Sequence, residues 1–280
     1  MSRIHFHLNE VDWKTFPQKG WGPLRWKDLL NEEQGGSKEF VFGLAELPPG
    51  GKLPFHAHRQ TETDYILSGS ARIRLGSRSI EVGPSSAVYF LGKAPHSLET
   101  LGSEPFRYVY AYACEKSGHS IDVELVKEDI QIAKDIEDWI EGTYRRWAIR
   151  EEVGELFSLE PSKGYRVRGM RLFDQTHGDA HEMKVGTFQI DPGIHYSLHY
   201  HEQPEIYYVI AGRGIIYVED SSVEACSGLA LYLGGKVVHG ADNLGEEPLH
   251  LYYIYGTETV GQSRNWTPVE DIYTEVRWRR

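Results

Sequence analysis

GGKLPFHAHRQTE (residues 50–62) and GIHYSLHYHEQPE (residues 193–205) share one spacing of glycine, histidine and glutamate. Each contains a His-x-His pair with a glutamate four residues later, and a further histidine follows the glutamate at the same distance in both copies. The pattern predicts two equivalent modules that each present three imidazoles and one carboxylate to a transition metal. The predicted ligands are His56, His58, Glu62 and His96 in the first copy and His199, His201, Glu205 and His239 in the second.

The repeat extends beyond the ligands. Residues 39–113 align without gaps to residues 182–256, so one constant offset relates the copies, and about a third of the positions are identical. Matched glycines, prolines and tyrosines record shared turns and strands. Histidine and glutamate are not needed to fill a β core, so their retention in register indicates a shared chemistry.

Composition narrows the class of protein. The net charge is −11 and no dense basic run occurs, so we expect neither a nucleic-acid partner nor a membrane surface as partner. The two cysteines, Cys114 and Cys226, occupy non-equivalent positions of the repeat, which argues against a structural disulfide and for a reducing compartment. Without a signal-like start or a long apolar span, we expect a soluble cytoplasmic protein.

Short alternating or apolar runs separated by Gly and Pro turns dominate both copies, as in residues 40–47, 71–75 and 106–113. Many short strands at this spacing predict an all-β sandwich or barrel. Residues 124–142 fit a helical period better and are predicted to form a helix between the modules. The tryptophan-rich N-terminal stretch is expected to pack on the first module as a flap or as extra strands.

The ligand spacing suits strands. Side chains alternate with a period of two, so His56 and His58 project on the same side about 6.5–7 Å apart. Glu62 follows at another even step, and the fourth ligand arrives from a separate strand. Imidazole and carboxylate together suit Fe or Mn, which we favour, or Ni, Co, Cu or Zn, with one ion per module.

Both copies resemble the cupin family. Gly50, His56, His58, Glu62 and Gly69 fill every fixed position of the first cupin motif, and so do their duplicates. The second motif is looser, because Phe90 and Leu233 stand where proline is usual and Thr100 stands for asparagine. The resemblance implies an all-β bicupin of two jelly-roll (double-stranded β-helix) barrels with a short helical connector. The expected domains are an N-terminal barrel with its flap over residues 1–118, a connector over 119–160 and a C-terminal barrel over 161–280.

Three further residues are candidates for catalysis. His195 lies an even number of residues before His199, so strand parity predicts that it shares the ligand face and could act as an acid or base. A surface histidine at a strand start is an equal alternative. Tyr65 and Tyr208, three residues after each glutamate, could donate a phenolic proton near the metal, although a packed barrel tyrosine is the commoner case.

The ligand set leaves the reaction open. The hypothesis that we rank first is a metal-dependent dioxygenase acting on a small enolate, diol or phenolic compound, an activity that the cupin resemblance permits. The second is a decarboxylase, lyase or sugar isomerase that uses the metal as a Lewis acid. The third is a binding or storage bicupin without enzyme activity, which eight intact ligands disfavour. We expect a small-molecule substrate, the second module as the main active site and a homodimer.

Overall fold

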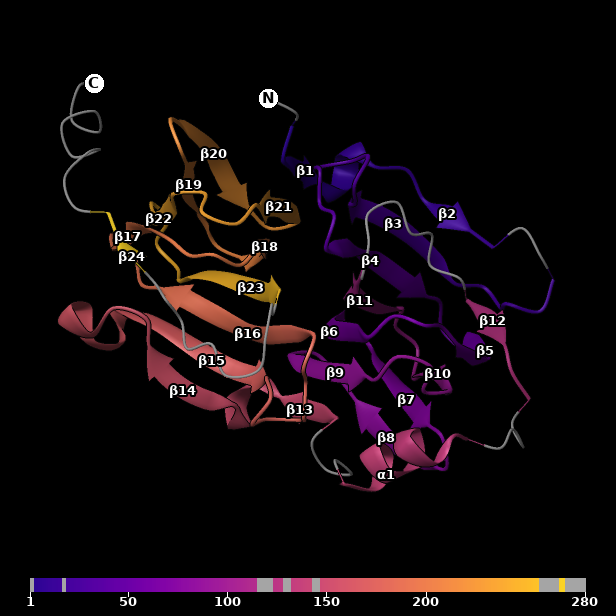
Figure 1. Ribbon diagram of the computed structural model, residues 1–280. Helices are drawn as coiled ribbons and strands as arrows, with labels where there is room; N and C mark the ends of the chain where they lie inside the picture. The colour runs from indigo at the N-terminus through magenta and orange to yellow at the C-terminus, as the bar shows by residue number, and fades with distance from the viewer. Residues whose placement is uncertain are drawn as a thin grey trace.

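The computed structural model describes residues 3–16, 19–114, 123–127, 132–142, 147–256 and 267–269 of the chain. Its strands form four sheets arranged as two barrels that lie side by side (Figure 1). Each barrel combines one seven-stranded sheet with one five-stranded sheet. The prediction of an all-β protein with two jelly-roll barrels is therefore confirmed.

Barrel one is built mainly from the first copy of the repeat. Its seven-stranded sheet has the order β13-β9-β6-β11-β4-β3-β2 and its five-stranded sheet the order β12-β5-β10-β7-β8. The strands are β2 (Lys14–Thr15), β3 (Arg25–Leu30), β4 (Phe40–Leu47), β5 (Lys52–Ala57), β6 (Glu62–Ser68), β7 (Ser70–Leu75), β8 (Arg78–Val82), β9 (Ser86–Phe90), β10 (His96–Leu101), β11 (Phe106–Ala113), β12 (Glu124–Leu125) and β13 (Ala148–Arg150).

Barrel two repeats this plan. Its sheets have the orders β1-β21-β18-β23-β16-β15-β14 and β20-β19-β22-β17-β24. The strands are β1 (His5–His7), β14 (Glu155–Ser158), β15 (Val167–Phe173), β16 (Met183–Ile190), β17 (His195–Tyr200), β18 (Glu205–Ala211), β19 (Arg213–Val218), β20 (Ser221–Cys226), β21 (Leu229–Leu233), β22 (His239–Asn243), β23 (Leu249–Gly256) and β24 (Thr267–Pro268).

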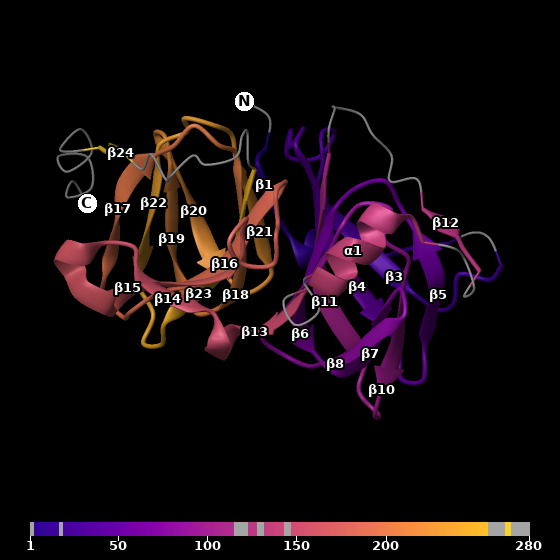
Figure 2. The same cartoon turned by 60° about the horizontal axis from the view of Figure 1, so that its bottom comes forward.

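The two barrels exchange their first strands. β1, at the N-terminus, pairs with β21 of barrel two, whereas β13, which follows the connector, pairs with β9 of barrel one. Figure 2 shows β1 beside β21, the strand with which it pairs. The offset that relates the two ligand quartets also relates β1 to β13 and β12 to β24. The repeat thus extends in three dimensions well beyond the stretch where sequence identity reveals it.

The helical connector is shorter than predicted. Helix α1 spans Lys134–Gly142, and its apolar residues Ile136 and Trp139 are buried against barrel one. Residues 124–125 form β12 instead of helix, because they pair with the exposed edge of β5. Part of the predicted helix, residues 128–131, lies outside the described residues. The remaining helical segments are single 3-10 turns or pairs of turns: η1 (Leu8–Glu10), η2 (Glu151–Val153) and η3 (Pro161–Arg166).

The N-terminal stretch divides between the barrels: β2 and β3 extend the seven-stranded sheet of barrel one, whereas β1 pairs with a strand of barrel two. The outer faces of the two seven-stranded sheets then pack against each other. Phe42 lies 5.8 Å from Tyr208 and Tyr65 lies 4.9 Å from Tyr252, measured between ring centroids. This apolar junction belongs to one hydrophobic cluster that both barrels share.

Among the described residues, no helix has the length and apolar character needed to span a membrane.

Candidate metal centres

Strand ends bring the four predicted ligands of barrel one together. β5 carries His56 near its end, His58 follows that strand, β6 begins at Glu62 and β10 begins at His96. His56 and His96 face each other directly across the β5–β10 ladder. Because several strands contribute, the rigid sheets fix the relative positions of the side chains.

The functional atoms of these side chains converge on one point. The nearest ring nitrogens of His56, His58 and His96 all lie within 4.8 Å of one another. Oε2 of Glu62 lies 2.8 Å from Nε2 of His58 and 3.3 Å from Nε2 of His96. All four side chains are buried. The set therefore has the compactness that a single ion requires.

Barrel two has the same arrangement. His199, His201 and His239 form the second group of nitrogens within 4.8 Å. Oε2 of Glu205 lies 3.2 Å from Nε2 of His201 and 3.3 Å from Nε2 of His239. The structure thus brings together both quartets that the sequence spacing singled out.

Backbone carbonyls orient all six imidazoles in the same way. Each Nδ1 lies 2.7–2.9 Å from a carbonyl oxygen two residues away in the chain. A carbonyl can only accept, so Nδ1–H donates and the lone pair resides on Nε2. Every Nε2 therefore faces the common centre in the form that binds a metal. The accepting carbonyls belong to Pro54, Gln60, Ala94, Ser197, Gln203 and Val237.

Burial and charge fit an ion at these centres. Burial alone would raise the pKa of Glu62 and Glu205, but the imidazoles packed against each carboxylate outweigh it and hold both pKa values below the ordinary range. Burial and the neighbouring His96 lower the pKa of His56 well below its usual value, which keeps this imidazole neutral. Nε2 of His239 is buried and makes no hydrogen bond among the described residues. An ion would satisfy that nitrogen and neutralise the carboxylate.

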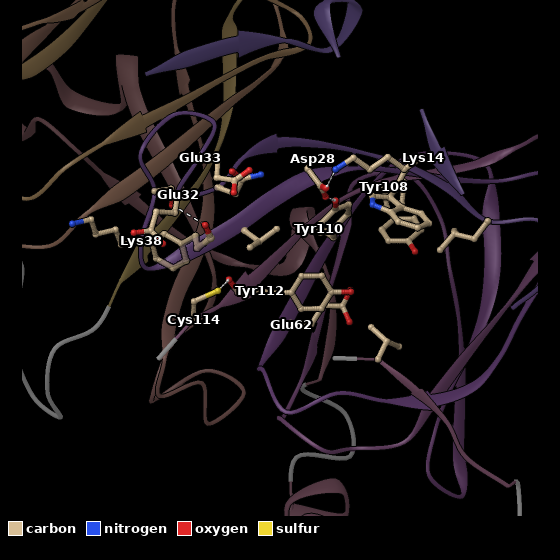
Figure 3. Close-up of a pocket in the computed structure, with 18 of the residues that line it drawn as sticks. Lys14, Asp28, Glu32, Glu33, Lys38, Glu62, Tyr108, Tyr110, Tyr112 and Cys114 are labelled. Atoms are coloured by element: carbon tan, nitrogen blue, oxygen red, sulfur yellow. Dashed lines mark hydrogen bonds and ion pairs between the residues drawn. The ribbon is translucent and has the colours of Figure 1, made fainter. Parts of the chain in front are cut away.

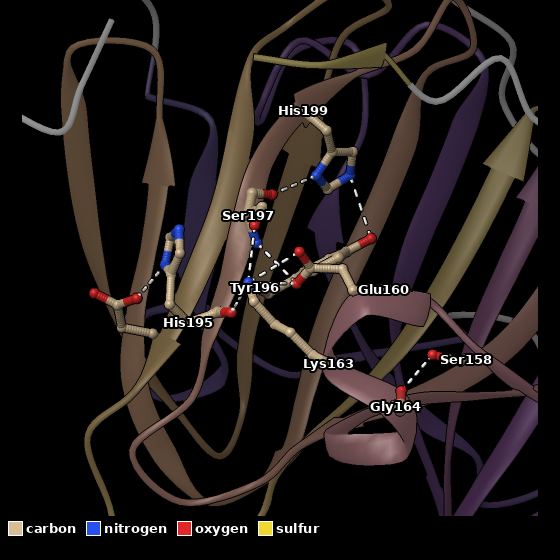
Figure 4. Close-up of polar contacts among 9 residues, drawn as sticks. Ser158, Glu160, Lys163, Gly164, His195, Tyr196, Ser197 and His199 are labelled. Carbon is tan, nitrogen blue, oxygen red and sulfur yellow. Dashed lines mark hydrogen bonds and ion pairs between the residues drawn. The ribbon is translucent and has the colours of Figure 1, made fainter. Parts of the chain in front are cut away.

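One tyrosine beside the second centre was missed by the sequence reasoning. Tyr196, in β17, is 2% exposed, and its hydroxyl lies 3.4 Å from Nε2 of His199 (Figure 4). The equivalent position of barrel one, at the offset of the repeat, is Leu53. Only barrel two therefore places a phenol at this position.

His195 does not lie on the face that strand parity predicts for it. β17 and β22 shift register between Tyr196 and His199, so an irregularity interrupts the alternation of faces. Tyr196 then turns inward, whereas His195 lies on the other side of β17, where its Nδ1 is 2.5 Å from Oδ1 of Asp242 (Figure 4). Barrel one has the partly exposed pair Lys52 and Glu99 at the same positions. The structure does not bring His195 to the ligands.

Tyr65 and Tyr208 also lie away from the centres. They are three residues beyond Glu62 and Glu205, and an odd step on a strand points to the opposite face. The hydroxyl of Tyr65 donates to Glu151 at 2.5 Å, and Tyr208 packs on Phe42 in the junction between the barrels. The commoner alternative, a packed barrel tyrosine, describes both residues.

Two residues after each ligand glutamate, on the same face of the strand, lies a side chain that can carry a proton. Asp64 of barrel one and Tyr207 of barrel two occupy equivalent positions, and both are buried. Burial and the neighbouring carboxylate of Glu62 raise the pKa of Asp64 well above its ordinary value. Burial and Glu205 likewise raise the pKa of Tyr207. The two interiors therefore differ in chemistry although their ligands are the same.

Barrel one contains a cavity that reaches its metal centre. It encloses about 560 Å³ and has Glu62 in its wall, with Tyr108, Tyr110 and Tyr112 of β11 along one side (Figure 3). These tyrosines share the inner face because they are two residues apart on one strand. Lys14 and Asp28, which form an ion pair at 2.6 Å, also line the cavity. A small organic molecule could therefore approach the ion position of barrel one.

Two jelly-roll barrels, each closed around three imidazoles and a carboxylate, define a two-domain metalloprotein. The cupin domain family matches this chain twice, over residues 43–112 and 186–255, which together make up half of its length. The chain belongs to the cupin family, as the sequence motifs predicted, and has the two barrels of a bicupin.

Individual relatives are enzymes. The chain is 30% identical over 108 residues to the dimethylsulfoniopropionate lyase of Ruegeria pomeroyi, a match that covers 37% of this chain and 70% of the lyase. Its fold resembles a variant of the oxalate decarboxylase of Bacillus subtilis, with a TM-score of 0.71 and 18% identity over 95% of this chain and 80% of that one.

The formate complex of the Lactobacillus farciminis oxalate decarboxylase gives a TM-score of 0.72 with 15% identity over 96% of this chain and 88% of that one. At such identities the likeness to both decarboxylases shows the fold alone. Mn(II) centres are described for the Bacillus subtilis enzyme.

Proposed function

We propose that this bicupin is a metal-dependent lyase or decarboxylase that acts on a small carboxylic acid without net oxidation, with barrel two as the main active site. The observation that carries the proposal is the buried hydroxyl of Tyr196 at 3.4 Å from Nε2 of His199. It places a group able to move a proton beside a ligand that faces the ion position. Lyases and decarboxylases need such a group, because they add or remove a proton at carbon.

Both kinds of named relative support a carboxylate substrate. One acts on dimethylsulfoniopropionate and the other on oxalate, as their names state. His199, His201, Glu205 and His239 would hold the ion, for which Mn or Fe is our preference on the basis of the imidazole and carboxylate donors. When bound, the ion supplies Lewis-acid polarisation of a substrate oxygen.

The protein groups complete the chemistry in either reaction. In an elimination, Tyr196 acts as its phenolate: it takes the proton from the carbon beside the carboxylate and becomes the neutral phenol, while a double bond forms and the leaving group departs with its electron pair. In a decarboxylation, the carbon–carbon bond breaks, CO2 departs, and the neutral Tyr196 donates its phenolic proton to the carbon that keeps the electrons and is left as phenolate. Neither reaction consumes an oxidant. Buried neighbours of Tyr196, among them Phe188 at 5.7 Å between ring centroids, exclude water from the phenol.

The test is turnover of a carboxylate panel that includes oxalate and dimethylsulfoniopropionate, with Mn- or Fe-loaded protein under strict anaerobiosis. We expect activity without oxygen and a loss of about 10²- to 10⁴-fold in kcat for Tyr196→Phe at unchanged metal content. Tyr217→Phe is the matched control, because this hydroxyl bonds Asp242 on the outer side of the sheet. Oxygen uptake in step with turnover would instead establish the dioxygenase hypothesis.

A further inference from the structure

An ion pair outside the barrel holds the segment that carries Tyr196. Glu160 precedes η3 and Lys163 lies within it, and the Lys163 Nζ is 2.9 and 3.0 Å from the two carboxylate oxygens of Glu160. The same Nζ donates to the backbone carbonyl of His195 at 2.7 Å and to Oγ of Ser197 at 2.9 Å. Oε2 of Glu160 accepts the backbone N–H of Ser197 at 3.1 Å. These contacts are drawn together in Figure 4.

Lys163 and Glu160 hydrogen-bond the backbone on both sides of Tyr196. In an extended strand, the carbonyl of residue 195 and the N–H of residue 197 point to the same edge. On that edge β24 pairs with β17 only at His199 and Tyr200, so the edge beside Tyr196 is not covered by that strand. Lys163 and Glu160 supply the donor and the acceptor that a neighbouring strand would provide there.

The side chains of this ion pair are largely buried, which makes its hydrogen bonds to the backbone rigid. The Glu160 side chain is 5% exposed and that of Lys163 is 29% exposed. A charge-assisted hydrogen bond shielded from water holds its geometry better than one on the open surface. The bonded groups also border the irregularity between Tyr196 and His199 that turns the phenol inward.

The sequence of barrel one has neither the ion pair nor the phenol at the equivalent positions. Pro54 stands where barrel two has Ser197, and proline has no N–H to donate. The positions equivalent to Glu160 and Lys163 are Pro17 and Gly20. The ligand quartet is thus shared by the two barrels, whereas among the described residues the ion pair and Tyr196 are found together in barrel two.

We infer that Glu160 and Lys163 are positioning residues that fix the Tyr196 hydroxyl beside His199, and that they set the rate of proton transfer in barrel two. The inference rests on the proposed function, because it assigns the pair a role through Tyr196. The pair is linked to the ligand His199 only through Ser197, whose carbonyl orients that imidazole. Lys163 and Glu160 bond the Oγ and N–H of Ser197 and not its carbonyl, so we expect metal content to change little.

A double-mutant cycle tests the inference. We expect Lys163→Met to lower kcat about 10- to 100-fold, with KM and metal content unchanged, because misplacing a catalytic group costs rate and not substrate affinity. In a Tyr196→Phe background the same change should cost less than twofold, since the group that it positions is gone. Equal losses in both backgrounds would overturn the inference. Lys134→Met, which breaks an exposed pair with Asp138 on α1, is the control for loss of a lysine.

Two further measurements separate this inference from the proposed function. Glu160→Gln keeps the side-chain shape, so it replaces Lys163→Met in the cycle if that variant does not fold. Crystal structures of the variants report the distance from the Tyr196 hydroxyl to Nε2 of His199 without reference to activity. A clear lengthening of that distance supports positioning even if Tyr196→Phe proves fully active, and an unmoved hydroxyl rejects it.

Discussion

Glu151 and Tyr65 are joined by a hydrogen bond of 2.5 Å across the junction between the two barrels. The other oxygen of the Glu151 carboxylate faces barrel two, where it accepts from Oγ1 of Thr187 at 2.8 Å and lies 2.9 Å from Nε2 of His250. Burial would raise the pKa of Glu151, but the contacts with His250 and Tyr65 outweigh it and hold this pKa below the ordinary value. One carboxylate, carried by the connector, therefore binds both barrels.

Glu151→Gln should lower the free energy of unfolding at pH 7 by about 1–3 kcal/mol, because it removes charged hydrogen bonds from a largely buried site. The folded pKa lies below the unfolded value, so the carboxylate contributes fully above the unfolded pKa and loses its contribution as the pH falls through the folded pKa. The difference in the free energy of unfolding between parent and variant should therefore decrease below about pH 4.5. Urea unfolding across a pH series measures it.

Glu152→Gln is the control for this experiment. Its side chain is 64% exposed and lies 3.4 Å from Arg150, so we expect a change below about 0.5 kcal/mol. A gap between parent and Glu151→Gln that is the same at pH 7 and pH 3.5 would contradict the assigned role of the carboxylate.

The metal stoichiometry can be resolved barrel by barrel. Glu62→Gln and Glu205→Gln each replace an anionic ligand oxygen with a neutral amide, while the imidazoles keep their carbonyl partners. We expect each variant to hold one ion fewer per chain than the parent, which has two quartets. Elemental analysis after dialysis against trace metal gives the count. His181→Gln, which alters an exposed histidine paired with Asp179, should leave the count unchanged.

The ligands could be predicted from the sequence because duplication recorded them twice at one offset. Strand parity then placed His56 and His58 on one side, and the observed convergence of the quartet agrees with that placement. The same parity failed for His195, because the irregularity of the β17–β22 ladder depends on pairing with a strand that is remote in sequence. No local signal in residues 193–205 reveals it.

The exchange of β1 and β13 between the barrels could not be predicted from the sequence either. β1 and β13 occupy equivalent positions, yet their sequences HFH and AIR share no residue. Each is held through backbone hydrogen bonds to a sheet edge, which constrain side chains weakly. Glu160 and Lys163 were missed for a related reason: their partners are backbone groups, and barrel one has no counterpart to align with them.

Gly43 is a position where the fold tolerates no side chain. A Cβ added there would lie 2.1 Å from the carbonyl oxygen of Lys27 and 2.4 Å from the hydroxyl of Tyr110. Gly43→Ala should therefore cost about 1–3 kcal/mol or more, because the backbone of β3 must shift. The equivalent Gly186 has the same crowding, from Met170 and Tyr253, and should respond alike.

Gly50 offers a comparison in which a substitution strains the backbone without crowding its neighbours. Its φ is +70°, and an added Cβ would meet nothing within 4 Å. Gly50→Ala should cost only the strain of a left-handed alanine, about 1–2 kcal/mol. Thermal unfolding of the three variants should rank Gly50→Ala as the most stable, and the reverse order would show that the sheet can accommodate the clash.

Bound metal should stabilise the fold. An ion that binds only the folded chain stabilises it by an amount that grows with the ratio of free ion to Kd, about 2.7 kcal/mol at a hundredfold excess. For a domain of this size that corresponds to a rise in Tm of roughly 5–10 °C. We therefore expect chelator to lower Tm and added Mn(II) or Fe(II) to restore it. The Glu62→Gln/Glu205→Gln double variant should show less than half of the parent's response, because it retains three imidazoles but no carboxylate in either barrel. An equal response in the double variant would place the stabilising ion elsewhere in the molecule.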